Sequence, residues 1–356
     1  MSTLLIVDDE PSIVKSLKGL LSDEGFDVLT APNGYEALKI IESDSPDLVL
    51  LDIWMQGMDG IRFAVLDKSL GWRGYANLRR QIENRRFPLL LHMHASQRAN
   101  LASLCVRADI RLGFDRARGR DGQYFFCNRH LPARSERHVM DGLFEFATGI
   151  GIEPGPPRWD IPVDDSDRAF AAEAIGDSGP SLIISPCTGQ RFRNFRNWRP
   201  ERYAAIADYA HRRFGARVLL TGGNSEIEQH YAREITRLAH CPIDDLIGRS
   251  SLKQLLCLIE RASVVLCPDS GPAHMATAVG TPVVGLYASS NRFRTGPWAS
   301  QHLVVDKYPE AVREEFGCDV AGIRWGRRVR SPDVMDRIEV DDVTEKLDMA
   351  FAESDI

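Results

Sequence analysis

Apolar and polar stretches alternate at a regular spacing over the first fifty residues of the chain. Three apolar runs, at residues 4–7, 26–30 and 47–51, predict buried strands. Apolar residues at helical spacing between Pro11 and Gly25, and again over residues 34–42, predict two helices. Strands and helices that alternate in this way form a parallel, doubly wound sheet, so we expect an α/β fold.

Acidic side chains follow two of these strands directly. Asp8 and Asp9 come after the first strand and Asp52 after the third, so all three fall at the carboxyl edge of the sheet, where doubly wound folds bind their ligands. Three converging carboxylates repel one another unless a hard cation such as Mg²⁺ lies between them. Asp8, Asp9 and Asp52 are therefore candidate Mg²⁺ ligands.

A second strand-turn-helix pattern lies much later in the chain. The largely apolar run at 262–266 does not alternate with polar residues and therefore predicts a buried parallel strand. A polar turn follows, and Pro272 then occupies a position where the first turn of a helix tolerates a missing N–H. The helix should end at residues 280–282, before another apolar strand at 283–287.

The start of this predicted helix is a candidate anion site. The first N–H groups of a helix have no partner inside it, and Ser270 and Gly271 lie beside them. Gly271 lets a ligand approach the backbone closely, and His274 lies one turn further on, where its ring can donate to a phosphate oxygen. These residues fit a pyrophosphate, although the same sequence also fits a turn that binds nothing.

Composition narrows the class of protein. A chain of 356 residues exceeds the length at which one hydrophobic core usually stops growing, so we expect two domains. A formal net charge of −6 argues against a nucleic-acid partner held by bulk electrostatics. Seven cysteines without a C-x-x-C pair, and the lack of a signal-like or membrane-spanning apolar run, predict a cytoplasmic protein, with a peripheral position at a membrane as the alternative.

Residues 1–61 resemble a response-regulator receiver domain. The resemblance rests on the Asp8–Asp9 pair, on Asp52 and on the loop that runs from Asp52 to Gly60. It implies that Asp52 accepts a phosphoryl group and that a histidine kinase is a partner. The resemblance ends near residue 61, because the strands ending in Ser/Thr and in Lys that complete a receiver are missing from the matching positions. A truncated receiver half that serves only as a scaffold is the alternative.

The segment D-S-G-P-A-H at 269–274 resembles the signature of glycosyltransferase family 9, together with G-T-P-V-V-G-L-Y at 280–287 and R-T-G-P at 294–297. This family holds the ADP-heptose:lipopolysaccharide heptosyltransferases, and the resemblance covers about residues 62–345. It implies inverting transfer of heptose from ADP-heptose to a lipopolysaccharide core or lipid A precursor acceptor at the inner membrane face. No cofactor would be required for the transfer.

The resemblance also implies the GT-B fold, in which two doubly wound Rossmann-like domains face each other across a cleft. We expect a receiver-like, flavodoxin-like segment at 1–61 and the remainder of the N-terminal acceptor domain at 62–151. A linker should follow at 152–178, rich in Pro, Gly and Asp over residues 152–165 and with a short helix at about 167–174. The nucleotide-sugar-binding domain should occupy 179–356, with its C-terminal helix packing back against the first domain.

Residues of both binding sites follow from the resemblance. Arg196 stands where the family has a lysine that reaches the nucleotide phosphates, and Glu226 is placed to accept hydrogen bonds from ribose hydroxyls. Glu226 fits equally well as a first-turn residue favoured by the helix dipole, and Trp198 is a packing residue. The donor-binding candidates are Thr188, Arg196, Glu226, Asp269, Ser270, Gly271 and His274.

Four arginines are the acceptor-binding candidates, because guanidinium groups bind phosphate in a bidentate manner and would suit a phosphorylated sugar-lipid. Each of them also fits a solvated surface. The four are Arg98, Arg116, Arg118 and Arg120.

The catalytic base remains unassigned. Family members begin with a strand and an S-x-x-G-D loop whose Asp is the presumed base, and the receiver-like segment occupies that place here. Asp8 and Asp9 are the candidates for a substitute base. Two alternatives follow: a two-component response regulator with a glycosyltransferase-like output domain, or a fusion with impaired catalysis.

Overall fold

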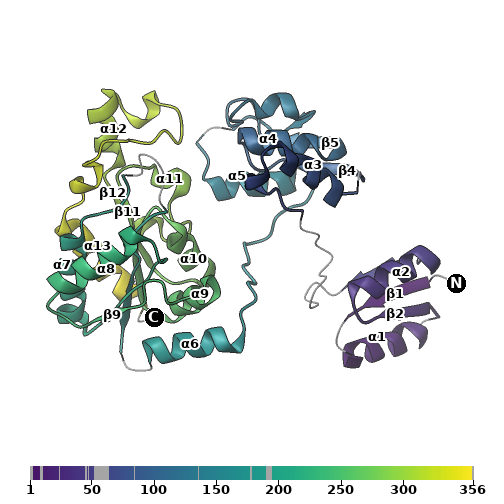
Figure 1. The fold of residues 1–356 in the computed structure, drawn as a ribbon, viewed down its shortest axis with the longest axis horizontal. Helices are drawn as coiled ribbons and strands as arrows, with labels where there is room; N and C mark the ends of the chain where they lie inside the picture. The colour runs from purple at the N-terminus through teal and green to yellow at the C-terminus, as the bar shows by residue number, and fades with distance from the viewer. Residues whose placement is uncertain are drawn as a thin grey trace. The chain divides into compact units, whose positions relative to one another are not determined.

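The structure is a computed structural model of an α/β chain with parallel sheets (Figure 1). It describes residues 3–8, 11–23, 25–44, 46, 48–51, 64–83, 85–134, 136–176, 179–189 and 195–354. The described residues divide into two compact units. The first comprises Met1–Leu90 and Arg98–Asp109, and the second comprises Leu91–Gln97 and Ile110–Ile356.

The first unit begins with the sheet that the sequence predicts. Its strands run in the order β2-β1-β3 and are parallel, with Leu5 of β1 paired to Leu29 and Val49. The small core of this sheet consists of Leu5, Val7, Ala31 and Ala37. The elements are β1 (Thr3–Val7), α1 (Pro11–Asp23), β2 (Asp27–Ala31), α2 (Gly34–Asp44) and β3 (Leu48–Leu51).

A second three-stranded sheet has the order β4-β5-β6, and the division between the two units passes through β4 and β5. Helix α5 begins where His138 Nδ1 accepts a hydrogen bond from the backbone N–H of Met140, 3.2 Å away. The elements of this region are η1 (Lys68–Leu70), α3 (Trp72–Gln81), β4 (Arg86–Leu91), α4 (Gln97–Leu104), β5 (Arg107–Gly113), η2 (Gln123–Phe126), β6 (Arg129–His130) and α5 (Val139–Gly149).

Most of the second unit is built on a six-stranded sheet with the order β12-β11-β10-β7-β8-β9. Strands β7 and β10 are buried at every residue, as their uninterrupted apolar sequences predict. The strands are β7 (Ser181–Ile184), β8 (Arg217–Leu220), β9 (Ile243–Asp245), β10 (Val264–Pro268), β11 (Val283–Tyr287) and β12 (Val305–Asp306).

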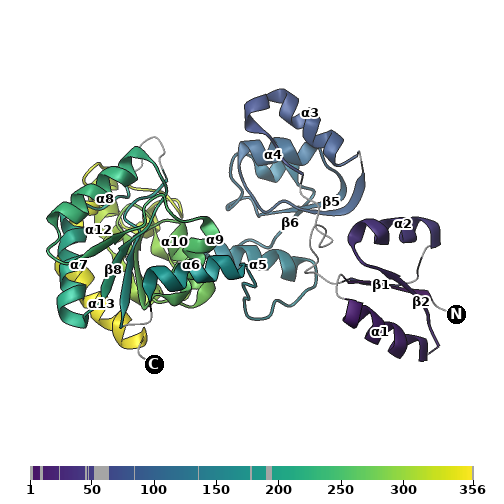
Figure 2. The ribbon, with the colours of Figure 1, turned by 60° about the horizontal axis from the view of Figure 1, so that its bottom comes forward.

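Helices cover both faces of this sheet (Figures 1 and 2). Alternate strand residues point to opposite faces, so Leu182 and Ile184 share a core with α7, α8, α12 and α13, whereas Ile183 packs with α6, α9 and α10. The helices are α6 (Asp165–Ile175), α7 (Pro200–Phe214), α8 (Glu226–Leu238), α9 (Leu252–Arg261), α10 (Gly271–Val279), α11 (Arg292–Thr295), α12 (Tyr308–Phe316) and α13 (Val340–Ser354). The 3₁₀ turns are η3 (Gln301–Leu303), η4 (Val320–Gly322) and η5 (Val334–Arg337).

Two helices near the predicted domain boundaries pack into the core of the six-stranded sheet. Part of the expected linker at 152–178 is helix α6, whose Ala171 and Ile175 join the core of the six-stranded sheet. Helix α13 was expected to pack against the first domain, but its Leu347 and Phe351 also lie in the core of this sheet. Hydrophobic burial against the nearest sheet therefore decides where both helices pack. The domain boundaries themselves stay a prediction.

Within the described part of the chain, no helix is long and apolar enough to cross a lipid bilayer.

Candidate functional site

The N-terminus of helix α10 is open toward the carboxyl end of β10. Ser270 occupies the N-cap position, but its Oγ donates to the carbonyl oxygen of Pro268, 3.0 Å away, and does not cap the helix. Pro272 lies in the first turn, as the sequence predicts. Gly271 is exposed, and a Cβ added to it would meet no atom within 4 Å. The first turn therefore presents its backbone N–H groups and the positive end of the helix dipole to an approaching anion.

Asp269 lies just before the N-cap residue of this helix, and its side chain forms hydrogen bonds with residues from other segments of the chain. Its side chain is buried, and Oδ2 accepts hydrogen bonds from Nη1 of Arg196 at 3.1 Å and from Oγ of Ser290 at 2.8 Å. Arg196 Nη1 also donates to the carbonyl oxygen of Asp269 at 2.6 Å, and Arg328 approaches the same carboxylate at 3.5 Å. The structure thus brings Arg196 to the start of α10, as a partner of Asp269.

His274 follows one turn into α10 and keeps an exposed face. Burial among the surrounding protein atoms lowers the pKa of this ring below 6.5; the negative charge of Asp269 opposes that shift, and His138 reinforces it. The ring is therefore neutral at pH 7 and can donate only one N–H. A bound anion nearby would favour its protonated form.

Thr188 and Glu226 occupy different surroundings at the same edge of the sheet. The backbone N and Oγ1 of Thr188 both donate to Oδ1 of Asn197, at 2.9 and 3.1 Å, so Thr188 holds the loop that carries Arg196. The capping box of α8 is formed by Ser225 and Glu228, not by Glu226. Glu226 is exposed and pairs with no side chain in the described part of the chain, so its carboxylate can reach a ligand.

Arg118, one of the four predicted acceptor residues, is occupied by internal partners. Its Nε contacts the carboxylate of Asp115, Nη1 lies 2.7 Å from Oε2 of Glu145, and Nη2 donates to the carbonyl oxygen of Pro132 at 3.0 Å. Both carboxylates raise the pKa of Arg118, although burial opposes the shift. Arg118 therefore holds the 115–118 turn to α5.

The other three predicted acceptor residues lie in different places. Arg98 is exposed on α4 in the first unit, and Arg116 is exposed on the loop after β5. Arg120 is half-buried and lines a cavity of about 660 Å³ in the second unit. The structure thus places only Arg118 and Arg120 at this cavity.

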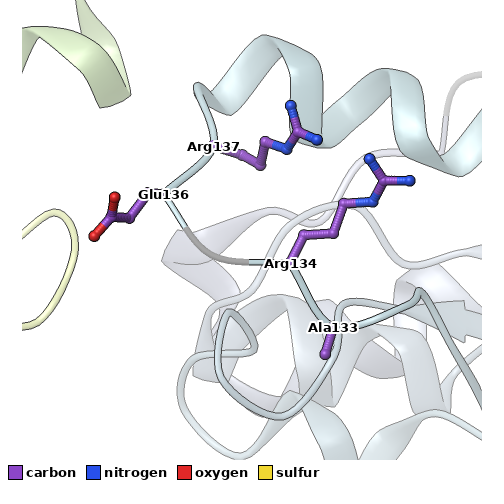
Figure 3. Close-up of a pocket in the computed structure, with 4 residues that line it drawn as sticks. All are labelled: Ala133, Arg134, Glu136 and Arg137. Carbon is purple, nitrogen blue, oxygen red and sulfur yellow. The ribbon is translucent and has the colours of Figure 1, made fainter.

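The cavity is lined mainly by residues 93–95, 114–120 and 134–143. Arg294, Arg324 and Trp325 complete the wall. Sequence reasoning missed these three as site residues, although Arg294 begins the R-T-G-P segment and could have been singled out there. Ala133, Arg134, Glu136 and Arg137 line an adjoining hollow, in which the side chains of Arg134 and Arg137 extend together while Glu136 points away from both (Figure 3).

Of the three carboxylates predicted to bind Mg²⁺, only Asp8 lies within the described residues. Asp8 is buried at the end of β1, where its backbone N–H donates to the carbonyl oxygen of Ala31 at 3.2 Å. Asp9 and Asp52 lie outside the described residues, so the predicted Mg²⁺ ligand set and the phosphoacceptor are not described. In the part of the chain that is described, no group of three or more His, Cys, Asp or Glu residues could hold a metal ion.

A doubly wound parallel sheet with an open helix start at its carboxyl edge is the architecture of a nucleotide-binding domain, such as the donor domain of a GT-B glycosyltransferase. The chain belongs to glycosyltransferase family 9 (heptosyltransferase), whose family model matches residues 75–318. A response regulator receiver domain model matches residues 4–66. Both resemblances inferred from the sequence are therefore confirmed.

Curated relatives and solved structures agree with this assignment. The chain is 35% identical over 289 residues to the lipopolysaccharide core heptosyltransferase OpsX of Haemophilus influenzae, covering 81% of this chain and 82% of that protein. The glycosyltransferase family 9 structure from Veillonella parvula aligns with a TM-score of 0.60 at 16% identity, over 99% of this chain and 97% of the other. E. coli heptosyltransferase WaaC with ADP aligns with a TM-score of 0.57 at 15% identity, over 98% and 99%. The predicted GT-B fold is thereby confirmed.

Proposed function

We propose that this chain transfers heptose from ADP-heptose to a lipopolysaccharide core acceptor. The observation that carries the proposal is the uncapped start of α10, which offers backbone N–H groups next to the Arg196–Asp269 pair. OpsX, the relative at 35% identity, is a lipopolysaccharide core heptosyltransferase, and WaaC has been solved with ADP. These two facts support a diphosphate-linked heptose as the donor.

In the proposed reaction, an acceptor hydroxyl attacks the anomeric carbon of the heptose. The bond between that carbon and the diphosphate oxygen breaks with inversion, and ADP leaves with the electron pair. Gly271 and the following amides, with His274 and Arg196, stabilise the negative charge that develops on ADP. Asp269 positions Arg196, and Glu226 accepts hydrogen bonds from the ribose.

A general base must take the proton of the acceptor hydroxyl. Asp8 and Asp9 remain our candidates, because Asp8 follows β1 at the carboxyl edge of its sheet, where a doubly wound domain presents catalytic groups, and Asp9 is the next residue in the sequence. The transfer needs no cofactor in this scheme. The acceptor is expected at the inner membrane face, with the chain bound there peripherally from the cytoplasm.

The receiver-like segment supports a second role. The receiver model matches residues 4–66, so phosphorylation of Asp52 by a histidine kinase, with Mg²⁺ held by Asp8, Asp9 and Asp52, is a candidate input to the enzyme. The match is shorter than a complete receiver sequence of the kind described above, so a scaffold role remains the alternative. Labelling with acetyl phosphate that is lost in Asp52→Ala would support the input role.

Acceptor-dependent release of ADP from ADP-heptose tests the proposed transfer directly. Purified protein should release ADP only when a lipopolysaccharide core acceptor is present, and mass spectrometry should detect the heptosylated product. His274→Ala should reduce the rate while leaving the fold intact, because its ring is at the surface of α10. ADP release without product, or no ADP release at all, would contradict the proposal.

We expect the affinity for ADP to increase as the pH falls from 8 to 6. Burial and the nearby His138 keep the pKa of His274 below 6.5 in the unliganded protein, so ADP must bind the neutral ring at high pH. A neighbouring diphosphate favours the protonated ring, and uptake of one proton strengthens binding by at most about tenfold per pH unit. Titration calorimetry should show this gain in wild type and a smaller gain in His274→Asn. Identical pH profiles for the two proteins would contradict contact between His274 and the diphosphate.

A further inference from the structure

Arg328 lies on the segment between η4 and η5, and its guanidinium group reaches the carboxylate of Asp269. Nη2 of Arg328 is 3.5 Å from Oδ2 of Asp269, the oxygen that also accepts hydrogen bonds from Arg196 and Ser290. Asp269 comes just before the N-cap residue of α10. The guanidinium group of Arg328 therefore lies close to the open start of this helix, where an anion is favoured.

The two arginines that approach Asp269 differ in exposure. The side chain of Arg196 is 11% exposed, and its Nη1 donates both to the carboxylate and to the carbonyl oxygen of Asp269. The side chain of Arg328 is 38% exposed. Nη1 of Arg196 is thus occupied by the protein itself, whereas part of the Arg328 side chain faces solvent, where a ligand can reach it.

Asp269 alone cannot neutralise both arginines. A carboxylate carries one negative charge, and two guanidinium groups carry two positive charges, because arginine keeps its proton in folded proteins. Burial, then the charge of Arg120 and then that of Arg328, lower the pKa of Arg294. The positive potential of Arg328 therefore extends beyond Asp269, and it adds to that of the helix dipole.

The segment that carries Arg328 is fixed to the carboxyl end of β11. The backbone N–H of Val329 donates to the carbonyl oxygen of Ser289 at 3.0 Å, and Oγ of Ser289 donates to the carbonyl oxygen of Val329 at 2.8 Å. The next residue, Ser290, donates to Asp269. Two consecutive serines thus hold the backbone at Arg328 and the side chain of Asp269 in register. This order before binding limits the entropy that is lost when a ligand binds.

We propose that Arg328 is a diphosphate-binding residue of the donor site and contacts the phosphate oxygens of ADP. Arg196 then has a supporting role, because it fixes Asp269, against which Arg328 is placed. Arg328 lies beyond residues 75–318, which the family model matches, so the family signature does not indicate it. The identity of the ligand as a diphosphate rests on the proposed function.

This position suits the charge that the proposed transfer creates. When the bond between the anomeric carbon and the diphosphate oxygen breaks, ADP leaves with the electron pair, and negative charge grows on its phosphate oxygens. A planar guanidinium group can donate two parallel hydrogen bonds to such oxygens. Arg328 is therefore placed to stabilise the leaving group together with the backbone N–H groups of α10.

Titration calorimetry of the full chain tests the assignment without any transfer. Arg328→Gln should bind ADP about ten- to a hundredfold more weakly than wild type, the loss expected when hydrogen bonds to a charged group are removed. Adenosine, which lacks both phosphates, should bind the two proteins equally. Arg328→Lys keeps the charge but loses the planar fork, so its ADP affinity should fall between those of wild type and Arg328→Gln.

The matched control is Arg330→Gln, which makes the same change at an exposed side chain two residues further along the segment. It should bind ADP as wild type does. Arg328→Gln should keep a Tm within about 2 °C of wild type, because Arg328 is partly exposed and Asp269 keeps Arg196 and Ser290 as partners. If Arg328→Gln does not fold, Arg328→Lys should still show a weaker affinity for ADP and an unchanged affinity for adenosine.

In the transfer assay, Arg328→Gln should raise the KM for ADP-heptose and leave the KM for the acceptor unchanged. Wild-type ADP affinity in a folded Arg328→Gln protein would overturn the assignment. An equal loss of affinity for ADP and adenosine would also overturn it, because the change would then not act on the diphosphate. If wild type binds ADP through Arg328 but transfers no heptose, the assignment stands and the proposed function fails. If wild type binds no ADP, both fail.

Discussion

Asp269→Asn is expected to lower the free energy of unfolding by about 3–5 kcal/mol, because it removes one partner of a buried ion pair. The side chains of Asp269 and Arg196 are only 7% and 11% exposed, and Arg196 would lose its ion pair with Asp269. The Ser290 hydroxyl would also lose a charged acceptor. Because Asp269 holds Arg196 at the start of α10, the Asp269→Asn variant should also have a lower affinity for ADP. Denaturant unfolding and titration calorimetry measure the two losses separately.

A surface pair provides the matched control for this prediction. Arg313 and Asp319 approach to 2.9 Å, but both side chains are largely exposed, so Asp319→Asn should cost less than about 1 kcal/mol. The double variant Arg196→Gln/Asp269→Asn should be less destabilised than the sum of its single variants, because the two single changes remove the same ion pair. Equal stability of Asp269→Asn and Asp319→Asn would show that the buried pair does not hold this site together.

The fold could be predicted because a strand that is buried on both faces has apolar residues at successive positions in the sequence. Strands such as β7 and β10 are apolar at nearly every position, since helices cover both faces of their sheet. Helix ends were less certain. The helix expected at about 167–174 begins at Asp165, because the Asp164 side chain and Asp167 form a capping box.

The donor-site residues could be predicted where they lie close together in the sequence. Ser270, Gly271 and His274 belong to one turn and one helix, so their proximity follows from the strand-turn-helix pattern alone. The partners of Asp269 are different, because Ser290 and Arg196 come from other strand ends. Only the folded sheet brings those segments together, and no spacing in the sequence indicates it.

The acceptor-side arginines illustrate why charge alone does not identify a binding residue. Arg118 and Arg120 lie two positions apart on one loop, yet Arg118 is neutralised by Asp115 and by the more distant Glu145, whereas Arg120 forms no ion pair with any residue that the structure describes. The Asp115–Arg118 pair could have been predicted from its i, i+3 spacing. The approach of Arg294 to Arg120 could not, because it depends on how helix α11, the loop after β5 and the segment at Gly326 pack together, and these are far apart in the sequence.

Gly271→Val is expected to weaken ADP binding about ten- to a hundredfold without destabilising the protein, the loss that follows when hydrogen bonds to a charged group are broken. The position is exposed, its φ is not in the left-handed region, and an added Cβ would meet nothing within 4 Å. The unliganded protein should therefore accept the side chain. A diphosphate at the start of α10 must approach the same backbone closely, and the valine methyl groups would hold it away.

The matched control for Gly271→Val is Gly155→Val, which adds the same side chain at another exposed glycine with open space around it. Both variants should show the wild-type Tm in the absence of nucleotide. In titration calorimetry, Gly155→Val should bind ADP as wild type does, and Gly271→Ala should fall between wild type and Gly271→Val, because a single methyl group obstructs the ligand less. Wild-type ADP affinity in a folded Gly271→Val protein would mean that the diphosphate binds elsewhere, since no ligand could then be in close contact with the amides of this turn.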